Sequence, residues 1–431
     1  MGRVRELVAL VAALAAALGF VQSTAARPDV GAVGARPFVQ AGSTAVTRPL
    51  LRFDRLALSR RLADALRVPH VPRKTSGALA IDLESGSVVY SLNPDRPLVP
   101  ASNEKLATSF AALVQLGADY RFRTEVLGTG ELDDSTWVGD LYLRGHGDPS
   151  LTTHDLKRLA GQLRTAGIRR VTGSVLADES AFDTRRTAPG WKPSFYMDES
   201  APLSALVVNR AIFRGKMTPD PAGAAAALFT AVLGERGIRV DGESGWGTAP
   251  ERASALAEVE SKPLAEILRF MDRESDNFTA EQVLKTLGAE VRGKGTTGAG
   301  AAVVAETLGD AGVPLQGVRI ADGSGLSRLD RLTPRALAAI LVTTWGDAAL
   351  RPVLWDALPV AGLSGTLERR MDARPARGAV HAKTGTTAIA SALSGYVRHR
   401  FVFVIVQNGH PISTWWARQA QDRFATALAA Q

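Results

Sequence analysis

The spacing of hydrophobic residues changes along the chain between that of strands and that of helices. Residues 77–92, GALAIDLESGSVVYSL, have two apolar runs on either side of a Ser-Gly turn, which predicts a β-hairpin. In residues 103–117 the apolar positions Leu106, Phe110 and Leu113 recur every three or four residues, which predicts a helix that ends at a glycine. A hairpin followed by a helix is therefore expected early in the folded region.

Residues 121–252 have a different pattern. Short apolar runs alternate here with turns rich in glycine and aspartate, which is typical of strands, and two stretches with helical spacing interrupt them. We therefore expect a β-rich segment with helices of its own. Its strands are expected in 122–130, 135–145 and 173–182, and its helices in 153–167 and 225–237.

Most of the chain after residue 253 has helical spacing, which later gives way to strands. Three apolar segments near the C-terminus are separated by short turns, which predicts an antiparallel meander, and a last helix follows them. Strands are expected in 378–385, 390–397 and 401–409, and helices in 55–67, 263–274, 278–288, 301–312, 333–345 and 415–430.

The first 26 residues predict a secretory signal. Two arginines in MGRVRE precede an uncharged run from Leu7 to Ala26, which ends in small residues. An uncleaved membrane anchor is the alternative, and the alanine-rich, weakly apolar run favours cleavage. Residues 27–47 have no sustained period and are expected to be a linker. We therefore expect an exported protein, either secreted or anchored at its N-terminus.

Composition and charge limit the partners of this 431-residue chain. Because it has no cysteine, it has no disulfide, no lipid-modified cysteine and no thiolate metal site. The net charge of +8 is dispersed, so an anionic membrane or cell-wall surface is expected as a partner and nucleic acid is not. The six histidines lack metal-binding spacing, and we expect no metal or other cofactor. The sequence carries no signal for an oligomeric state.

The stretch PASNEKLATSF, residues 100–110, places Ser102 three residues before Lys105 where the predicted helix begins. This spacing brings both side chains to the same face of a helix. Serine needs an adjacent base to become a nucleophile, and lysine can be that base if burial or a nearby cation lowers its pKa. The simpler interpretation is a serine at the N-cap of the helix and a solvated lysine.

Two further motifs contain residues suited to the same chemistry. Ser275-Asp276-Asn277 lies in the joint between two predicted helices, where its simpler interpretation is a capping turn. Lys383-Thr384-Gly385, followed by Thr386, lies at the end of a predicted apolar strand. A lysine in such a strand is expected to border a cleft, and the glycine allows a ligand to approach the backbone.

The three motifs together, on a helix, a helix–helix joint and a strand, match the Ser-x-x-Lys, Ser-x-Asn, Lys-Thr-Gly set of penicillin-interacting serine enzymes. The interval from Ser102 to Ser275 is far longer than in class A β-lactamases, and it contains the β-rich segment. This organisation resembles the class C low-molecular-mass penicillin-binding proteins, the D-alanyl-D-alanine carboxypeptidase/endopeptidase family. The stretches LYLRGHGDPSL, ADGSGLSR and HAKTGTTAIASALSGYV also resemble that family.

The resemblance implies an α+β fold of the penicillin-binding, β-lactamase-like transpeptidase type. In that fold an antiparallel sheet is flanked by helices and joined to an all-helical part, and here a β-rich domain is inserted between the first and second motifs. We therefore expect the catalytic domain in 48–120 and 253–431 and the inserted domain in 121–252, after the signal or anchor (1–26) and the linker (27–47).

The resemblance also implies catalytic roles. Ser102 would attack the carbonyl of the penultimate D-alanine, and Lys105 would take its proton. Ser275 would relay a proton to the departing D-alanine, and Asn277 would orient Lys105. Lys383 would supply positive charge that helps to keep Lys105 neutral and attracts the anionic substrate.

Further residues are expected to bind the substrate. Thr384 and Thr386 would hold its terminal carboxylate, and Gly385 would let the substrate approach the backbone. The backbone N–H groups of Ser102 and Thr386 would form the oxyanion hole. The inserted region of the family can also contribute an acidic group that binds the free amine of the peptide. Here Asp198 is the candidate and Glu199 the alternative, although a solvated loop also explains both residues.

The implied activity is that of a serine-type D-Ala-D-Ala carboxypeptidase on the cell-wall side of a bacterial membrane. Its substrates would be peptidoglycan stem peptides, with D,D-endopeptidase cleavage of cross-links as a second activity. β-Lactam antibiotics would inhibit it by acylating Ser102. A β-lactamase is the alternative enzyme, but no convincing Glu-x-x-Leu-Asn loop is present. A wall-bound scaffold with a silenced site is a further alternative, against which the three intact motifs argue.

Overall fold

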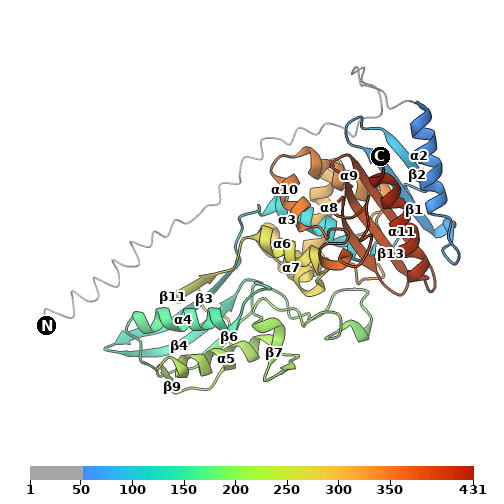
Figure 1. Ribbon diagram of the computed structural model, residues 1–431. Helices are drawn as coiled ribbons and strands as arrows, with labels where there is room; N and C mark the ends of the chain where they lie inside the picture. Colours follow the sequence, from blue (N-terminus) through green and yellow to red (C-terminus); the bar gives the residue numbers. More distant parts are fainter. Residues whose placement is uncertain (1–51) are drawn as a thin grey trace. The chain divides into compact units, whose positions relative to one another are not determined.

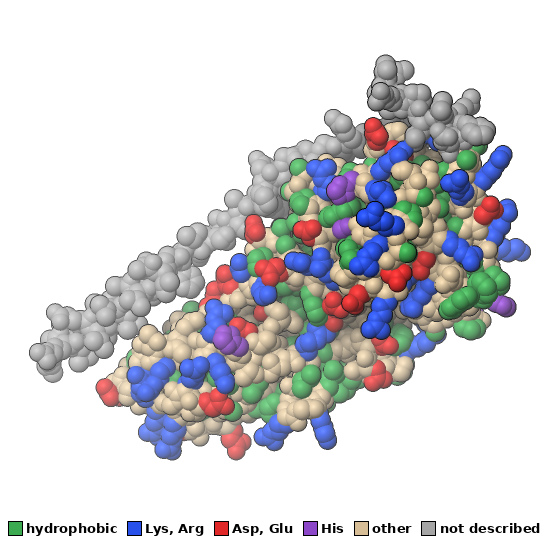
Figure 2. Space-filling view, in the orientation of Figure 1, with side chains coloured by type: hydrophobic (Ala, Val, Ile, Leu, Met, Phe, Trp, Pro, Cys, Tyr) green, Lys and Arg blue, Asp and Glu red, His purple; other side chains and the backbone are tan. Residues whose placement is uncertain are grey.

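The computed structural model describes residues 52–431, with side chains from residue 55 onward. The predicted signal or anchor (1–26) and linker (27–47) lie outside the described residues. No helix within the described range is both long and apolar enough to cross a membrane. Figure 2 shows basic and acidic side chains interspersed over the visible face, in keeping with the dispersed charge of the sequence.

The first sheet has five antiparallel strands in the order β12-β13-β14-β1-β2. Strands from the two ends of the described chain pair directly in it, with Ala80 of β1 opposite Phe403 of β14. The predicted N-terminal hairpin and C-terminal meander therefore form one sheet. Its strands are β1 (Ser76–Asp82), β2 (Val88–Leu92), β12 (Val380–Thr386), β13 (Ala390–Val397) and β14 (Phe401–Asn408).

Helices cover both faces of this sheet, namely α2 (Arg52–Ala65), α9 (Pro334–Gly346) and α11 (Thr414–Ala429). Along β14, Phe403 packs in the core shared with α2 and α11, whereas its neighbour Val404 packs in the core shared with α9. Figure 1 shows α2 and α11 beside β1, β2 and β13. Burial of both faces explains why β1, β13 and β14 are buried along nearly their whole length rather than at alternate residues.

A separate core holds the helical part of the molecule. Nearly all of α3 is buried there, and its neighbours carry apolar residues that face it. The sequence did not indicate α10, which is short and has a proline in its first turn. The helices of this part are α3 (Glu104–Gln115), α6 (Leu264–Arg273), α7 (Asn277–Arg292), α8 (Thr297–Asp310) and α10 (Leu350–Ala357).

The β-rich segment forms a second, seven-stranded sheet with a core of its own. Its central strands, β3 and β4, are a long antiparallel hairpin, and β6 joins β4 in parallel. Helices α4 (Thr153–Thr165) and α5 (Pro221–Glu235) pack in this core. The strands are β3 (Arg123–Asp133), β4 (Thr136–Gly145), β5 (Arg170–Val171), β6 (Val175–Asp178), β9 (Arg239–Val240), β10 (Gly245–Trp246) and β11 (Ser254–Glu260).

The last strand of this sheet, β11, lies beyond residue 252, where the insertion was expected to end. The domain bounds inferred from the sequence otherwise stay a prediction. The remaining elements are short: β7 (Ile212–Phe213) pairs with β8 (Lys216–Met217), and single 3-10 turns occupy η1 (Arg73–Thr75), η2 (Ala101–Asn103), η3 (Pro193–Phe195), η4 (Asn209–Ala211) and η5 (Gly365–Leu367).

Candidate active site

Ser102 lies in the 3-10 turn η2, immediately before α3. The sequence predicted this serine at the N-cap of the helix, which is wrong because the additional tight turn moves the N-cap to Asn103. The turn is entered through Ala101 in the left-handed region (φ 48°), which is costly for a residue with a side chain. A Cβ at Gly325 would lie 1.9 Å from the carbonyl oxygen of Ala101, so only glycine fits behind the serine.

Lys105 is fully buried one helical turn away from the serine. Its Nζ lies 3.2 Å from Ser102 Oγ, 2.8 Å from Asn277 Oδ1 and 2.7 Å from the carbonyl oxygen of Ser324. A charged ammonium donates to all three oxygens. A neutral amine donates to Asn277 and Ser324 and offers its lone pair to the serine hydroxyl, which is the arrangement that a general base needs.

A second serine–lysine pair faces the first. Lys383 Nζ donates to Ser275 Oγ at 2.8 Å, and Ser275 has left-handed backbone geometry (φ 58°) in the joint between α6 and α7. Asp276 has another function, because its carboxylate caps α7 by accepting from the Thr279 N–H and pairs with Arg210. Asp276 is therefore a capping residue, as in the simpler interpretation of this motif, whereas Ser275 and Asn277 face the site.

The edge strand β12 runs directly against the turn that holds the nucleophile. A Cβ at Gly385 would lie 3.1 Å from the backbone nitrogen of Ser102, and Asn103 Nδ2 donates to the carbonyl oxygen of Lys383 at 3.0 Å. The N–H of Thr387 pairs with β13, so strand alternation directs the N–H of Thr386 away from that partner. The N–H of Thr386 thus lies on the free edge of the sheet.

These groups border a pocket of about 250 Å³. Six predicted residues line it: Ser102, Ser275, Asn277, Thr384, Gly385 and Thr386. The two lysines lie buried beneath it. Glu199 lines the pocket and Asp198 does not, so the structure places the alternative acidic residue here rather than the first candidate.

Comparison with known proteins identifies the family of the chain. The family model of the D-Ala-D-Ala carboxypeptidase 3 (S13) family matches residues 58–223 and 216–431. The chain belongs to this family. A D-alanyl-D-alanine carboxypeptidase of Actinomadura sp. strain R39 is 33% identical over 92% of this chain and 91% of its own length. The carboxypeptidase DacB of Mycolicibacterium smegmatis is 32% identical over 82% of this chain and 80% of its own.

A solved structure supports the fold of this S13 protein. Penicillin binding protein 4 (dacB) of Haemophilus influenzae matches with a TM-score of 0.75 and 22% identity, over 85% of this chain and 98% of that one. The expected α+β fold, with an extra sheet beside the penicillin-binding sheet and helices, is thereby confirmed, as is the expected family. The role of each motif residue stays a prediction.

Burial is the largest cause of the lowered pKa values of the two lysines at this site. It lowers the pKa of Lys105 from 10.5 to about 8, while nearby carboxylates led by Asp322 oppose the shift. Burial and, to a lesser extent, the charge of Lys105 lower the pKa of Lys383 to about 7, while Asp272 opposes the shift. Lys383 was expected to help keep Lys105 neutral, whereas desolvation is the cause that lowers the pKa of Lys105 here, and the charge of Lys105 acts on Lys383.

Buried carboxyl groups support the site from behind. Glu281 accepts hydrogen bonds from the backbone N–H groups of Gly323 and Ser324, which holds the carbonyl that receives the Lys105 amine. Burial raises the pKa of Glu281 to about 8. The fully buried Glu104 has its pKa raised well above the usual range by burial and by neighbouring acids. Among the described residues, no group of three or more His, Asp or Glu side chains is arranged to hold a metal ion.

Arg418 and Thr366 are among the pocket residues that sequence reasoning missed. Arg418 of α11 donates from Nη2 to Thr386 Oγ1 at 3.4 Å, and it has no ion pair among the residues described. Thr384 Oγ1 donates to Thr366 Oγ1 at 2.7 Å, which orients the threonine of the third motif. Neither Arg418 nor Thr366 belongs to a local motif. The turn of α11 that contains Arg418 has the spacing of an ordinary amphipathic helix, so no local feature of the sequence indicated either residue.

The raised pKa of Glu281 predicts a pH-dependent stability. Between pH 4.5, the ordinary value of the group, and about 8, the folded state keeps a proton that the unfolded state loses, so stability falls as pH rises. In Glu281→Gln this contribution disappears while the amide oxygen still accepts from Gly323 and Ser324. We expect the unfolding midpoint of the variant to fall less than that of the wild type between pH 5 and 8.5, by differential scanning fluorimetry. The exposed Glu251→Gln is the control, and parallel wild-type and Glu281→Gln curves would refute the burial argument.

Proposed function

We propose that this chain is a serine-type D,D-peptidase that removes the terminal D-alanine from peptidoglycan stem peptides. We propose D,D-endopeptidase cleavage of cross-links as a second activity of the same site, because both reactions break a bond between D-alanine and an amine. The observation that carries the proposal is the contact of Lys105 Nζ with both Ser102 Oγ and Asn277 Oδ1, opposite the Lys383–Ser275 pair. Family membership and the names of the relatives support the same reaction.

Acylation begins with the Ser102 hydroxyl. Its oxygen attacks the carbonyl carbon of the penultimate D-alanine, and its proton passes to the neutral amine of Lys105, 3.2 Å away. The N–H groups of Ser102 and Thr386 stabilise the oxyanion, which is worth a few kcal/mol (about 3) per donor. Ser275 then gives its proton to the leaving D-alanine amine and regains one from Lys383, its partner at 2.8 Å.

Deacylation completes the cycle. Water attacks the ester carbonyl of the acyl-enzyme and gives up a proton, which passes through Ser275 to Lys383 and restores the charge of Lys383. The bond to Ser102 Oγ then breaks, and the serine oxygen recovers a proton from Lys105. A β-lactam antibiotic follows the first half of this path, because it presents a carboxylate beside a strained amide. Its acyl-enzyme persists, since the leaving amine stays attached within the opened ring and blocks the approach of water.

The pocket also suggests how the peptide is held. We assign the terminal carboxylate to Thr384 and Thr386, together with Arg418, which already donates to the Thr386 hydroxyl. Glu199 binds the free amine of the stem peptide in this proposal, since it lines the pocket and its backbone carbonyl holds Asn277 Nδ2 at 3.0 Å. The position of Asp198 outside the pocket makes it the weaker candidate.

We propose that the enzyme acts outside the cytoplasm, on the cell-wall side of a bacterial membrane. The support for this is the arginine-flanked apolar run within residues 1–26 and the nature of the proposed substrate. The mild positive charge of +8 would favour contact with an anionic wall or membrane surface.

The first test measures products. Incubation with a stem peptide ending in D-Ala-D-Ala is expected to release D-alanine, detected by a coupled oxidase assay.

Intact-protein mass spectrometry after penicillin treatment is expected to show one stable adduct, which Ser102→Ala abolishes. Rapid turnover of penicillin without release of D-alanine would replace this proposal with a β-lactamase, and an adduct on another residue would overturn the assignment of Ser102.

The second test concerns the base. Because the site needs one neutral lysine to take the serine proton and one charged lysine to return a proton to Ser275, the rate of acylation by a fluorescent penicillin is expected to be highest between about pH 7 and about pH 8 and to fall on either side. Lys105→Arg, which stays charged, is expected to abolish acylation at every pH, whereas the exposed Lys262→Arg is expected to leave the profile unchanged. An apparent pKa near 10.5, that of free lysine, would contradict the role of burial.

The third test concerns the missed arginine. Arg418→Gln removes a cationic donor from the carboxylate-binding end of the pocket, so KM for the stem peptide is expected to rise by about tenfold, or ~1.4 kcal/mol, with a smaller change in kcat. Arg423→Gln on the same helix is the matched control. With a peptide whose C-terminal carboxylate is amidated, Arg418→Gln and wild type are expected to behave alike, and a difference there would show that Arg418 acts elsewhere.

A further inference from the structure

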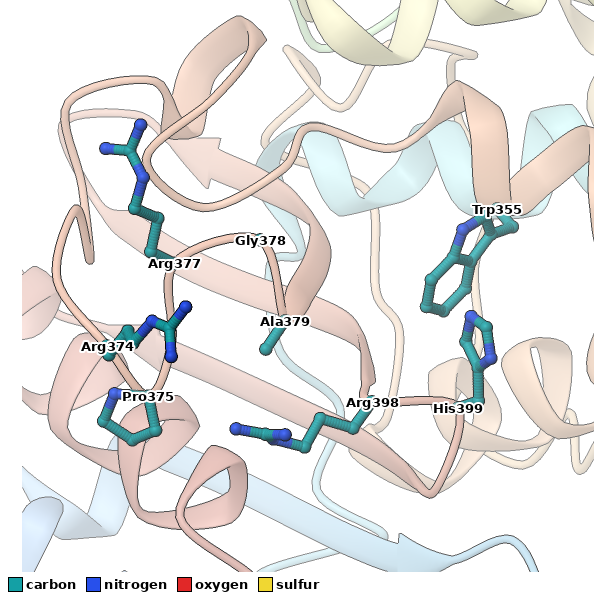
Figure 3. A pocket seen from close by; sticks show the side chains of 8 residues that line it. All are labelled: Trp355, Arg374, Pro375, Arg377, Gly378, Ala379, Arg398 and His399. Atoms are coloured by element: carbon teal, nitrogen blue, oxygen red, sulfur yellow. The ribbon is translucent and has the colours of Figure 1, made fainter.

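A larger pocket lies at the other end of β12 from the catalytic motif. Its volume is about 490 Å³, and it is lined by Trp355, Arg374, Pro375, Arg377, Gly378, Ala379, Arg398 and His399 (Figure 3). Ala379 immediately precedes β12, and Gly385 of the catalytic motif lies six residues further along the strand. At about 3.3 Å per residue, the two sites are about 20 Å apart. The pocket is therefore separate from the proposed active site.

Three arginines make one side of this pocket positively charged. Arg374, Arg377 and Arg398 are exposed, and none of them forms an ion pair with an acidic side chain in the described part of the chain. In the view of Figure 3, the side chain of Arg398 extends toward Arg374 and Pro375, while that of Arg377 points away from them. Arg377 donates from Nη1 to the carbonyl oxygen of Asp372 at 3.4 Å, whereas the forks of Arg374 and Arg398 leave N–H donors free for an anion from solution.

Arg398 is held in place rather than freely mobile. Its Nε donates to the carbonyl oxygen of Ala429 at the end of α11, at 2.7 Å. The two terminal nitrogens of the guanidinium are not used by that bond. An arginine fixed through Nε keeps its outer edge available in a set orientation, which reduces the entropy lost when a ligand binds.

The pocket wall includes a tight hairpin turn whose left-handed positions carry residues that rarely adopt this conformation. The N–H of Arg400 bonds to the carbonyl of Val397, which closes a two-residue turn between β13 and β14. Both central residues, Arg398 (φ 52°) and His399 (φ 58°), are left-handed, the geometry for which such turns normally use Asn-Gly. Arginine is a poor choice there for the turn itself, and strained residues of this kind gather at functional sites.

Aromatic stacking forms the opposite wall. The ring of Trp355 stacks on His381 at 3.8 Å between ring centroids and meets His399 edge-on at 4.2 Å. In Figure 3, Trp355 and His399 lie together, away from Arg374 and Arg377. The pocket thus combines a cationic side with a packed aromatic side, which suits an anion carried on an organic group.

We propose that this pocket is a binding site for the phosphate group of a phosphate ester. Guanidinium groups bind phosphate through paired N–H···O hydrogen bonds, and Arg374 and Arg398, which extend toward each other in Figure 3, can offer such pairs to one tetrahedral anion. The same chemistry is offered by a phosphodiester wall polymer, by a phospholipid headgroup and by free phosphate. The site does not depend on the proposed peptidase activity, and it would hold the enzyme on a phosphate-bearing surface while the catalytic pocket stays open.

The test uses the whole chain and three probes. Isothermal titration calorimetry measures binding of inorganic phosphate and of soluble poly(glycerol phosphate), and sedimentation measures binding to phosphatidylglycerol–phosphatidylcholine vesicles against phosphatidylcholine alone. Arg374→Gln, Arg377→Gln and Arg398→Lys alter the pocket, the last retaining the charge but losing the fork. Arg96→Gln removes an exposed charge elsewhere and serves as the matched control.

Binding of at least one phosphate-bearing probe is expected, and it should weaken by about tenfold in Arg374→Gln and in Arg398→Lys but not in Arg96→Gln. D-alanine release from a short peptide should stay at the wild-type level in all of these variants. Binding of only the polymer, or only the anionic vesicles, would identify the source of the phosphate and support the site. An equal loss in Arg96→Gln would show general charge attraction, and no binding of any probe would also overturn the proposal.

Discussion

The burial of one amine organises the catalytic part of this protein. Lys105 Nζ has no solvent contact and is held by oxygens from three separate parts of the chain: the turn before α3, the start of α7 and the loop at Ser324. A buried ammonium is costly unless hydrogen bonds compensate it, and the cheaper response is loss of its proton. The same contacts that make the lysine tolerable in the core therefore prepare it as a base. The left-handed backbone at Ala101 and Ser275 follows from this burial, because Ser102 and Ser275 must face lysines that are fixed in the core.

The segment between the first two motifs contributes to this arrangement as well as forming its own sheet. Arg210 pairs with Asp276 at the N-terminus of α7, and the backbone carbonyl of Glu199 receives Asn277 Nδ2. Asp183 pairs with Lys285 further along the same helix. Three contacts from the segment thus fix the helix that presents Asn277 to Lys105. A long insertion could otherwise loosen the site, since only the two ends of the segment are covalently joined to the catalytic part.

The two pockets differ in how they manage positive charge. Beneath the catalytic pocket, burial lowers the pKa of Lys105 to about 8, and burial together with the charge of Lys105 lowers the pKa of Lys383 to about 7. In the pocket beside Trp355, the arginines are exposed and remain charged, because guanidinium does not lose its proton at the pH of any cell. Lysine suits proton transfer and arginine suits anion binding, and each type occurs where its chemistry is needed.

Local patterns in the sequence were enough to predict the periodic elements, the three motifs and the family. Amphipathic helices and strands impose a local spacing of apolar residues, and the chemistry of the Ser-x-x-Lys, Ser-x-Asn and Lys-Thr-Gly motifs requires particular residue types at short intervals. The expected hairpin, meander and most helices followed from this spacing, while α10 did not because a short helix has too few turns to show it. Which residues of the motifs face the site depends on the folded arrangement. Ser102 lies before the N-cap of α3, and Asp276 pairs with Arg210. Glu199 and Arg418 line the pocket although they are distant in the sequence. These outcomes depend on long-range packing and on the desolvation that follows from it, and neither leaves a pattern in neighbouring residues.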